Sequence, residues 1–193
     1  MNQLDLSRSL QLDSPIGDCY QGDAVVHWTL FIAHRRQGWL NDSFHAQFRE
    51  LMLHAAAREG LVCPVYCLVP DHLHFIWMGL RPDCDQRNGM TFLRAQLKPL
   101  IAPLKFQQQA HGHVLKPYER RRGAFAGICN HILENPLRAE LVATPAEWPF
   151  SGAIAPGYPA LHPLQDNFWP VFGKLYARLK HPAAREVTPA PTW

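Results

Sequence analysis

The chain has 193 residues, 47% of them hydrophobic, and a formal net charge of +3 at pH 7. This length suits one domain with a real core, and the hydrophobic share excludes a disordered chain. The five cysteines form no CxxC pair, which argues against a disulfide framework or a cysteine-rich zinc module and favours reduced thiols. No apolar run reaches 18 residues and the N-terminus does not resemble a signal peptide, so we expect a cytoplasmic protein with no membrane partner.

Seven elements are predicted from the hydrophobic pattern. β-Branched and aromatic residues mark the strands, and apolar residues at spacings of three and four mark the helices. In chain order they are strand 24–34, helix 42–60, strands 61–69 and 72–80, helix 90–112, strand 113–116 and helix 123–135. The tight turn at Pro70-Asp71 makes a hairpin of the second and third strands.

Capping residues and prolines refine these boundaries. Asp42 or Ser43 can cap the first helix, and Gly60 follows its end. Pro64 indicates that the second strand is an edge strand or contains a bulge. Pro136 disfavours helical geometry at the residue before it, so the last helix is expected to end or bend there. Two further prolines, Pro99 and Pro103, are expected to kink or break the helix predicted at 90–112.

The order of these elements predicts the fold class. A strand-helix-strand-strand-helix-strand core is the ferredoxin-like α+β arrangement, with one antiparallel sheet and helices on one face. An additional helix follows it toward the C-terminus. We expect a lead-in at residues 1–22, one domain at 23–155 and an extension at 156–193, whose proline-rich end is expected to be disordered.

Two histidines stand at a spacing of two in the third predicted strand. Residues at this spacing point to the same face, so His72 and His74 project side by side while Leu73, Phe75 and Trp77 face the helices. Two imidazole nitrogens on one face can bind a divalent ion, although two ligands alone are too few. The simpler interpretation is a pair of polar residues on the solvent side of the sheet, and the spacing by itself favours it.

Two segments together resemble one known family. "PDHLHFIW" follows a strand, and "NHILENPLRAELV" comes some sixty residues later. This pair of motifs resembles the single-tyrosine HUH transposases, and most of all the branch of REP-associated tyrosine transposases. Members of that branch carry "PDHxH" on a strand and a pattern like "YIxxNPxRAxLV" on a later helix. The resemblance extends over roughly residues 24–155.

The resemblance implies a reaction, a cofactor and a partner. It implies that His72 and His74 bind Mg²⁺ or Mn²⁺, which polarises the scissile phosphate of single-stranded or hairpin DNA. A tyrosine then attacks the phosphorus, and a covalent phosphotyrosine stores the energy for rejoining. Asn135 matches the polar residue that completes the metal site one helical turn after the nucleophile. Such proteins act as DNA strand transferases and work as monomers or homodimers.

The nucleophile position itself departs from the family pattern, because His131 stands where tyrosine is expected. The first alternative is a catalytically inactive nucleic-acid-binding module of the same fold. The second is a catalytic or ligating histidine: His131 attacks phosphorus as a neutral imidazole, or joins His72 and His74 in a three-histidine site for a more zinc-like ion. The third is a substitute tyrosine. Tyr118 is the nearest candidate, although a loop is expected there, and Tyr66 lies further back.

Basic residues near the predicted nucleophile helix are candidates for phosphate contacts. They gather in "KPYERRR" and continue into "NPLRA". The predicted DNA-binding residues are Lys116, Arg120, Arg121, Arg122 and Arg138. Trp148 and Phe150 are suited to stacking on bases, but such residues more often dock a C-terminal segment onto the core, and we favour docking.

Overall fold

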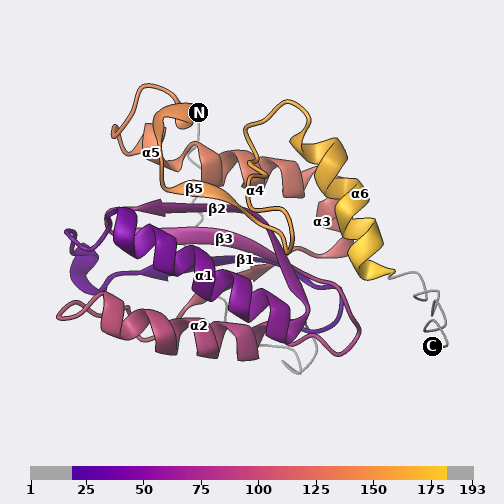
Figure 1. Ribbon diagram of the computed structural model, residues 1–193, viewed down its shortest axis with the longest axis horizontal. Helices are drawn as coiled ribbons and strands as arrows, with labels where there is room; N and C mark the ends of the chain where they lie inside the picture. The colour runs from indigo at the N-terminus through magenta and orange to yellow at the C-terminus, as the bar shows by residue number, and fades with distance from the viewer. Residues whose placement is uncertain (1–18, 182–193) are drawn as a thin grey trace, which may run out of the picture.

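The computed structural model describes residues 19–181 and shows a five-stranded antiparallel sheet (Figure 1). The strands lie in the order β4-β1-β3-β2-β5. Their bounds are β1 Val25–Phe31, β2 Leu61–Val69, β3 His72–Gly79, β4 His111–Val114 and β5 Ser151–Ile154. The order of the first four strands is that of a ferredoxin-like sheet, so the predicted fold class is confirmed.

Helices cover both faces of this sheet. Their bounds are α1 Asp42–Glu59, α2 Gln86–Leu100, α3 Pro117–Arg121, α4 Ala124–Leu133, α5 Asn135–Arg138 and α6 Phe168–Lys180, with short 3-10 turns η1 Ala33–Arg35 and η2 Pro145–Glu147. Helices α1 and α2 lie on one face, as expected for the core, and α4 lies on the other with α6 beside it (Figure 1). None of the helices within residues 19–181 has both the length and the apolar character needed to cross a membrane.

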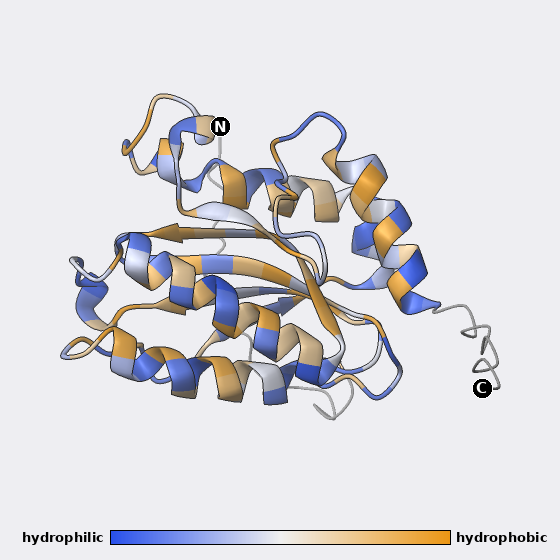
Figure 2. Ribbon diagram, in the orientation of Figure 1, coloured by the Kyte–Doolittle hydropathy of each residue, from blue (hydrophilic) through white to orange (hydrophobic). Residues whose placement is uncertain are grey.

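Two buried clusters explain this layering. On the α1/α2 face, Phe48 and Leu93 pack against Trp28 and Phe75 of the sheet. On the α4 face, the buried side chains of the helix pack against strand residues that include Ile76. Every residue of β2 is buried because the strand is covered on both faces, and Figure 2 shows it as hydrophobic along its length.

Several boundaries differ from the predicted ones for local reasons. Asn41, rather than Asp42 or Ser43, caps α1 by accepting a 2.9 Å hydrogen bond from the Phe44 amide. Helix α2 begins at Gln86 because the Asp85 side chain caps it, and it ends at Leu100, after Pro99. The break near Pro136 is confirmed, because α4 ends at Leu133 and the separate turn α5 follows.

The bulge predicted from Pro64 is present. The register of β2 shifts between Val62 and Tyr66 against β3, and between Cys63 and Tyr66 against β5. Strand β2 is therefore an internal strand with a bulge, and the edge on that side belongs to β5, which the sequence pattern did not reveal.

The segment after residue 155 adds to the core. Helix α6 buries Phe168, Phe172 and Leu175 against Val62 of β2 and Ala153 of β5. The expected disordered end lies outside the described residues, as does most of the expected lead-in. At the start of the described chain, Gln21 already pairs with Asp85 in an isolated bridge.

Candidate metal and nucleic-acid site

The start of β3 places the histidine pair on the α4 face of the sheet. His72 and His74 alternate with Leu73 and Phe75, which are buried on the α1/α2 face. The expectation that both imidazoles share one face is therefore confirmed. The solvent-side interpretation is wrong, because His74 is only 7% exposed beneath the helix.

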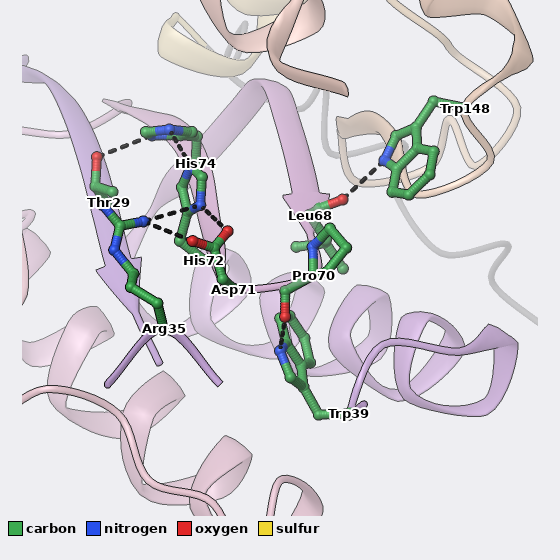
Figure 3. Close-up of polar contacts among 9 residues, drawn as sticks. All are labelled: Thr29, Arg35, Trp39, Leu68, Pro70, Asp71, His72, His74 and Trp148. Carbon is green, nitrogen blue, oxygen red and sulfur yellow. Dashed lines mark hydrogen bonds and ion pairs between the residues drawn. The ribbon is translucent and has the colours of Figure 1, made fainter. Parts of the chain in front are cut away.

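The two imidazoles present their Nε2 atoms to one another at 3.0 Å. The Nδ1 atom of His72 is 2.6 Å from a carboxylate oxygen of Asp71, which only accepts, so this nitrogen carries the proton. Nδ1 of His74 lies 2.9 Å from the Thr29 hydroxyl (Figure 3). The same nitrogen lies 3.1 Å from Nε2 of His27. When His74 Nδ1–H donates to Thr29, neither Nε2 atom carries a proton, so both keep a free lone pair.

This arrangement fits two ligands of one divalent ion. Two imidazole nitrogens, each about 2.1 Å from a shared ion and at about a right angle, are about 3 Å apart. Fixing the tautomer through the opposite ring nitrogen is how proteins prepare a histidine to bind metal. In the described part of the chain, no group of three or more histidine, cysteine, aspartate or glutamate side chains is placed to hold an ion. Further ligands must come from an amide, from water or from a substrate oxygen.

The imidazoles of His27, His72, His74 and His131 are neutral at pH 7. Burial lowers the pKa of His74 well below 6.5, and the neighbouring imidazoles of His27 and His72 lower it further. Burial likewise lowers the pKa of His27 to about 4 and lowers the pKa of His72 and of His131. Neutral imidazole is the form that binds a metal ion, so the site is ready for one at physiological pH.

Stability is expected to decline as the pH falls below 6.5. Burial lowers the pKa of both His27 and His45 to about 4, so between pH 6.5 and 4 the unfolded chain binds protons that the folded chain does not. The stability contribution is complete above pH 6.5 and is lost as the pH falls toward 4, by about 3 kcal/mol for His27. Urea unfolding from pH 7.5 to 4.5 measures this loss, and a flat profile would contradict it. His27→Gln should reduce the loss of unfolding free energy over this pH range. The control His54→Gln, at an exposed position, should leave that loss unchanged.

Helix α4 brings His131 to the pair. The rings of His131 and His74 have their centroids 6.0 Å apart, and the buried Cys129, Ile132 and Leu133 fix the helix on the sheet. Asn135 begins α5 after the helix has ended, and its side chain makes no hydrogen bond to another described residue. The roles expected for His131 and Asn135 stay predictions.

The tyrosine alternatives lie elsewhere. Tyr66 is fully buried on the α1/α2 face, where its hydroxyl accepts a 2.6 Å hydrogen bond from Arg49 and lies 2.9 Å from Nε2 of His45. Burial raises its pKa to about 12, and the sheet separates it from the histidine pair, which excludes it as the attacking group there. Tyr118 lies in the first turn of α3, not in a loop, and is 50% exposed.

The predicted DNA-binding residues lie within α3, at its two ends and on α5. Helix α3 packs against α4, so its basic residues lie on the side of the sheet that carries the histidines. Most of these side chains are exposed, and Arg138 forms an ion pair with Glu134 at 2.9 Å. No hydrogen bond or ion pair within residues 19–181 joins them to His72 or His74. The set, which stays a prediction, is Lys116, Arg120, Arg121, Arg122 and Arg138.

Sequence reasoning missed three residues of the site. His27, Thr29 and Arg35 come from β1 and the loop after it, and only the register of β1 against β3 brings them to the pair. Thr29 lies directly opposite His74, and an aromatic-rich strand gives no sign of such a partner. Arg35 donates a 2.9 Å hydrogen bond to Asp71. Asp71 is the aspartate of the "PDH" motif, so the sequence shows the acceptor of this bond but not its donor.

Two tryptophans hold the hairpin that carries the pair. Nε1 of Trp148 donates to the Leu68 carbonyl at 2.8 Å, and Nε1 of Trp39 donates to the Pro70 carbonyl at 2.6 Å (Figure 3). Phe150 packs edge-on against Trp148. The docking interpretation of Trp148 and Phe150 is therefore confirmed.

The fold and the site define a ferredoxin-like domain that carries a His-x-His pair, half-buried at His72 and buried at His74, beneath a helix. A solved structure of a REP-associated tyrosine transposase bound to a REP hairpin has the same fold, with a TM-score of 0.59. The two chains are 18% identical, and the match covers 72% of this chain and 82% of the other. No protein-family model matches the sequence, and no match was found among curated proteins. The fold class is thus shown, and the activity must be argued from the site.

Proposed function

We propose that this protein binds single-stranded or hairpin DNA on the α4 face of its sheet, with Mn²⁺ or Mg²⁺ between His72 and His74. The observation that carries the proposal is the 3.0 Å approach of the two Nε2 atoms, with each opposite nitrogen held by a hydrogen bond. The shared fold supports it, because the solved structure of that fold is bound to a REP hairpin. Metal-assisted strand cleavage and joining is the reaction that we assign to the site.

Each residue has a defined part in this reaction. When bound, the ion would polarise the scissile phosphate and stabilise the charge that develops on it. Asp71 and Thr29 hold the two imidazoles in the binding tautomer, and α4 covers the pair and excludes bulk water. Exposed basic side chains on α3 and at its two ends neutralise the phosphates on either side of the scissile one.

His131 takes the position of the attacking group. Its lowered pKa keeps the imidazole neutral at pH 7, so a nitrogen lone pair is available without loss of a proton. Attack forms a nitrogen–phosphorus bond as the bond from phosphorus to the 3′ oxygen breaks. The phosphorylated imidazole gives up the proton on its other nitrogen, and the leaving oxygen takes up a proton to give a 3′ hydroxyl. The 5′ phosphate stays on the histidine. Reversing these steps with another 3′ hydroxyl rejoins the strand.

The second candidate function is nucleic-acid binding without cleavage. His131 itself favours it, because a phosphoramidate is a less durable intermediate than the phosphotyrosine of the resembling family. In this alternative His72 and His74 hold the ion, and the ion holds a phosphate, but no bond is broken. Both candidates require that the protein binds the nucleic acid at the same face.

Incubation with a labelled hairpin oligonucleotide and Mn²⁺ separates the two candidates. Cleavage predicts a covalent protein–DNA adduct on a denaturing gel at neutral or alkaline pH, which His72→Ala and His131→Ala both abolish. His131→Tyr is expected to form a more durable adduct, because the rest of the site is unchanged. Binding without adduct or nicking by the unchanged protein would favour the second candidate. Failure to bind any hairpin or single-stranded oligonucleotide would contradict both.

A further inference from the structure

The loop after β1 has a strained backbone beside the histidine pair. His34 and Arg35 have φ values of 58° and 53°, so two consecutive residues other than glycine occupy the left-handed region. Such conformations cost free energy and persist only where the surroundings enforce them. Here two backbone hydrogen bonds hold the chain just before these residues. The amide of the buried Ile32 donates to the carbonyl of Asp71, in the turn before β3, at 2.9 Å, and the amide of Ala33 donates to the Lys105 carbonyl at 2.7 Å.

The strained loop fixes the guanidinium of Arg35 at the entrance to the pair. Its central carbon lies 4.0 Å from the centre of the Phe31 ring, and its NH1 donates to Asp71 at 2.9 Å. The other oxygen of the same carboxylate accepts from His72, so one residue, Asp71, aligns both the arginine and the metal-binding imidazole (Figure 3). The Arg35 side chain is nevertheless 53% exposed.

We propose that Arg35 is a phosphate-binding residue that grips the DNA backbone next to His72, an inference that rests on the proposed function. A guanidinium has five N–H donors, and NH1 alone is engaged by side chains of the described residues. The remaining edge, formed by Nε and NH2, matches two oxygens of one phosphate. Stacking on Phe31 and the bond to Asp71 hold the side chain before DNA arrives, so little rotamer freedom is lost on binding.

A purely structural role would act through Asp71. In that case Arg35 only aligns the carboxylate, which aligns His72, and its loss weakens metal binding. A phosphate contact makes the opposite prediction, because its loss weakens DNA binding in the absence of metal. The two roles therefore differ in a quantity that can be measured without any cleavage.

The test is fluorescence anisotropy of a labelled hairpin oligonucleotide with a single-stranded tail, in EDTA and over a range of salt concentrations. Arg35→Ala is expected to weaken binding about tenfold, and to reduce the slope of log K against log salt by about 0.7 to 0.9, the value for one lost phosphate contact. Arg35→Lys recovers only part of the affinity, because a point charge lacks the two-pronged geometry. If the alanine variant does not fold, the Arg35→Lys variant still tests the phosphate contact.

Arg58 provides the matched control. It also lies over an aromatic ring, at 4.8 Å from the centre of Phe92, and its side chain is 61% exposed, but it belongs to α1 on the opposite face of the sheet. For Arg58→Ala, the DNA affinity should stay within about twofold of that of the unchanged protein. The slope of log K against log salt should stay within about 0.3. Single methylphosphonate substitutions in the DNA then locate the contact. Substitution of the contacted phosphate should weaken DNA binding by the unchanged protein. The same substitution should not weaken DNA binding by Arg35→Ala any further.

Three results would overturn the inference. Equal DNA affinities for Arg35→Ala and Arg58→Ala would refute the phosphate contact while leaving the proposed function intact. A fall in Mn²⁺ affinity in Arg35→Ala, with unchanged DNA binding in EDTA, would assign the residue to the alignment of Asp71. If the unchanged protein binds no oligonucleotide, the proposed function fails and the inference fails with it.

Discussion

Replacing His74 by alanine is expected to lower the affinity for Mn²⁺ by about 100-fold or more, because it removes one of the two nitrogen donors that the fold brings together. The side chain is buried next to Thr29 and His72, so no other described imidazole takes its position without a rearrangement. Isothermal titration calorimetry measures the change, and circular dichroism verifies that the variant is folded. An unchanged affinity in a folded variant would place the metal elsewhere or remove it from the function.

Two further variants refine this result. His54→Ala removes an exposed imidazole of α1 and should leave the affinity unchanged, which controls for adventitious binding by histidine. Thr29→Val keeps the shape of the side chain but removes the hydroxyl 2.9 Å from Nδ1 of His74. It is expected to cost about tenfold in Mn²⁺ affinity, because the tautomer is no longer fixed.

Gly79→Ala is expected to destabilise the protein by about 3 kcal/mol or more, which lowers Tm by about 10 °C. Gly79 ends β3, and a Cβ atom there would lie 1.7 Å from the carbonyl oxygen of Gly22 and 2.9 Å from its carbonyl carbon. Both obstacles are backbone atoms, so the segment before β1 must move. Thermal or urea unfolding checks the effect.

Gly127→Ala is the matched control and should have the opposite sign. Gly127 lies inside α4, and a Cβ atom there would meet nothing within 4 Å beyond the nearby backbone of its own helix. Alanine in a helix interior is more stable than glycine by about 0.5 to 1 kcal/mol, so Tm should rise by a few degrees. A Gly79→Ala variant that melts with the unchanged protein would show that the segment at Gly22 does not pack on the end of β3.

Much of the core was predictable because its signals are local. A run of apolar and aromatic residues predicts β3, and the spacing of two places His72 and His74 on one face whatever surrounds them. The prolines at 64 and 136 mark a bulge and a helix end through their own geometry. Strand β5 and helix α6 were missed, because a four-residue strand gives little periodicity and α6 follows a segment rich in proline and glycine.

The site divides in the same way. The sequence by itself determined the histidine pair, its common face and the presence of a histidine at position 131, since these depend on spacing and residue type alone. Only the tertiary structure decided that His74 is buried beneath α4, that Thr29 and His27 hold its imidazole, and that Arg35 shares Asp71 with the imidazole of His72. These contacts join residues 36 to 47 positions apart in the chain. Such partners are chosen by strand register and helix packing, which no local pattern in a single sequence encodes.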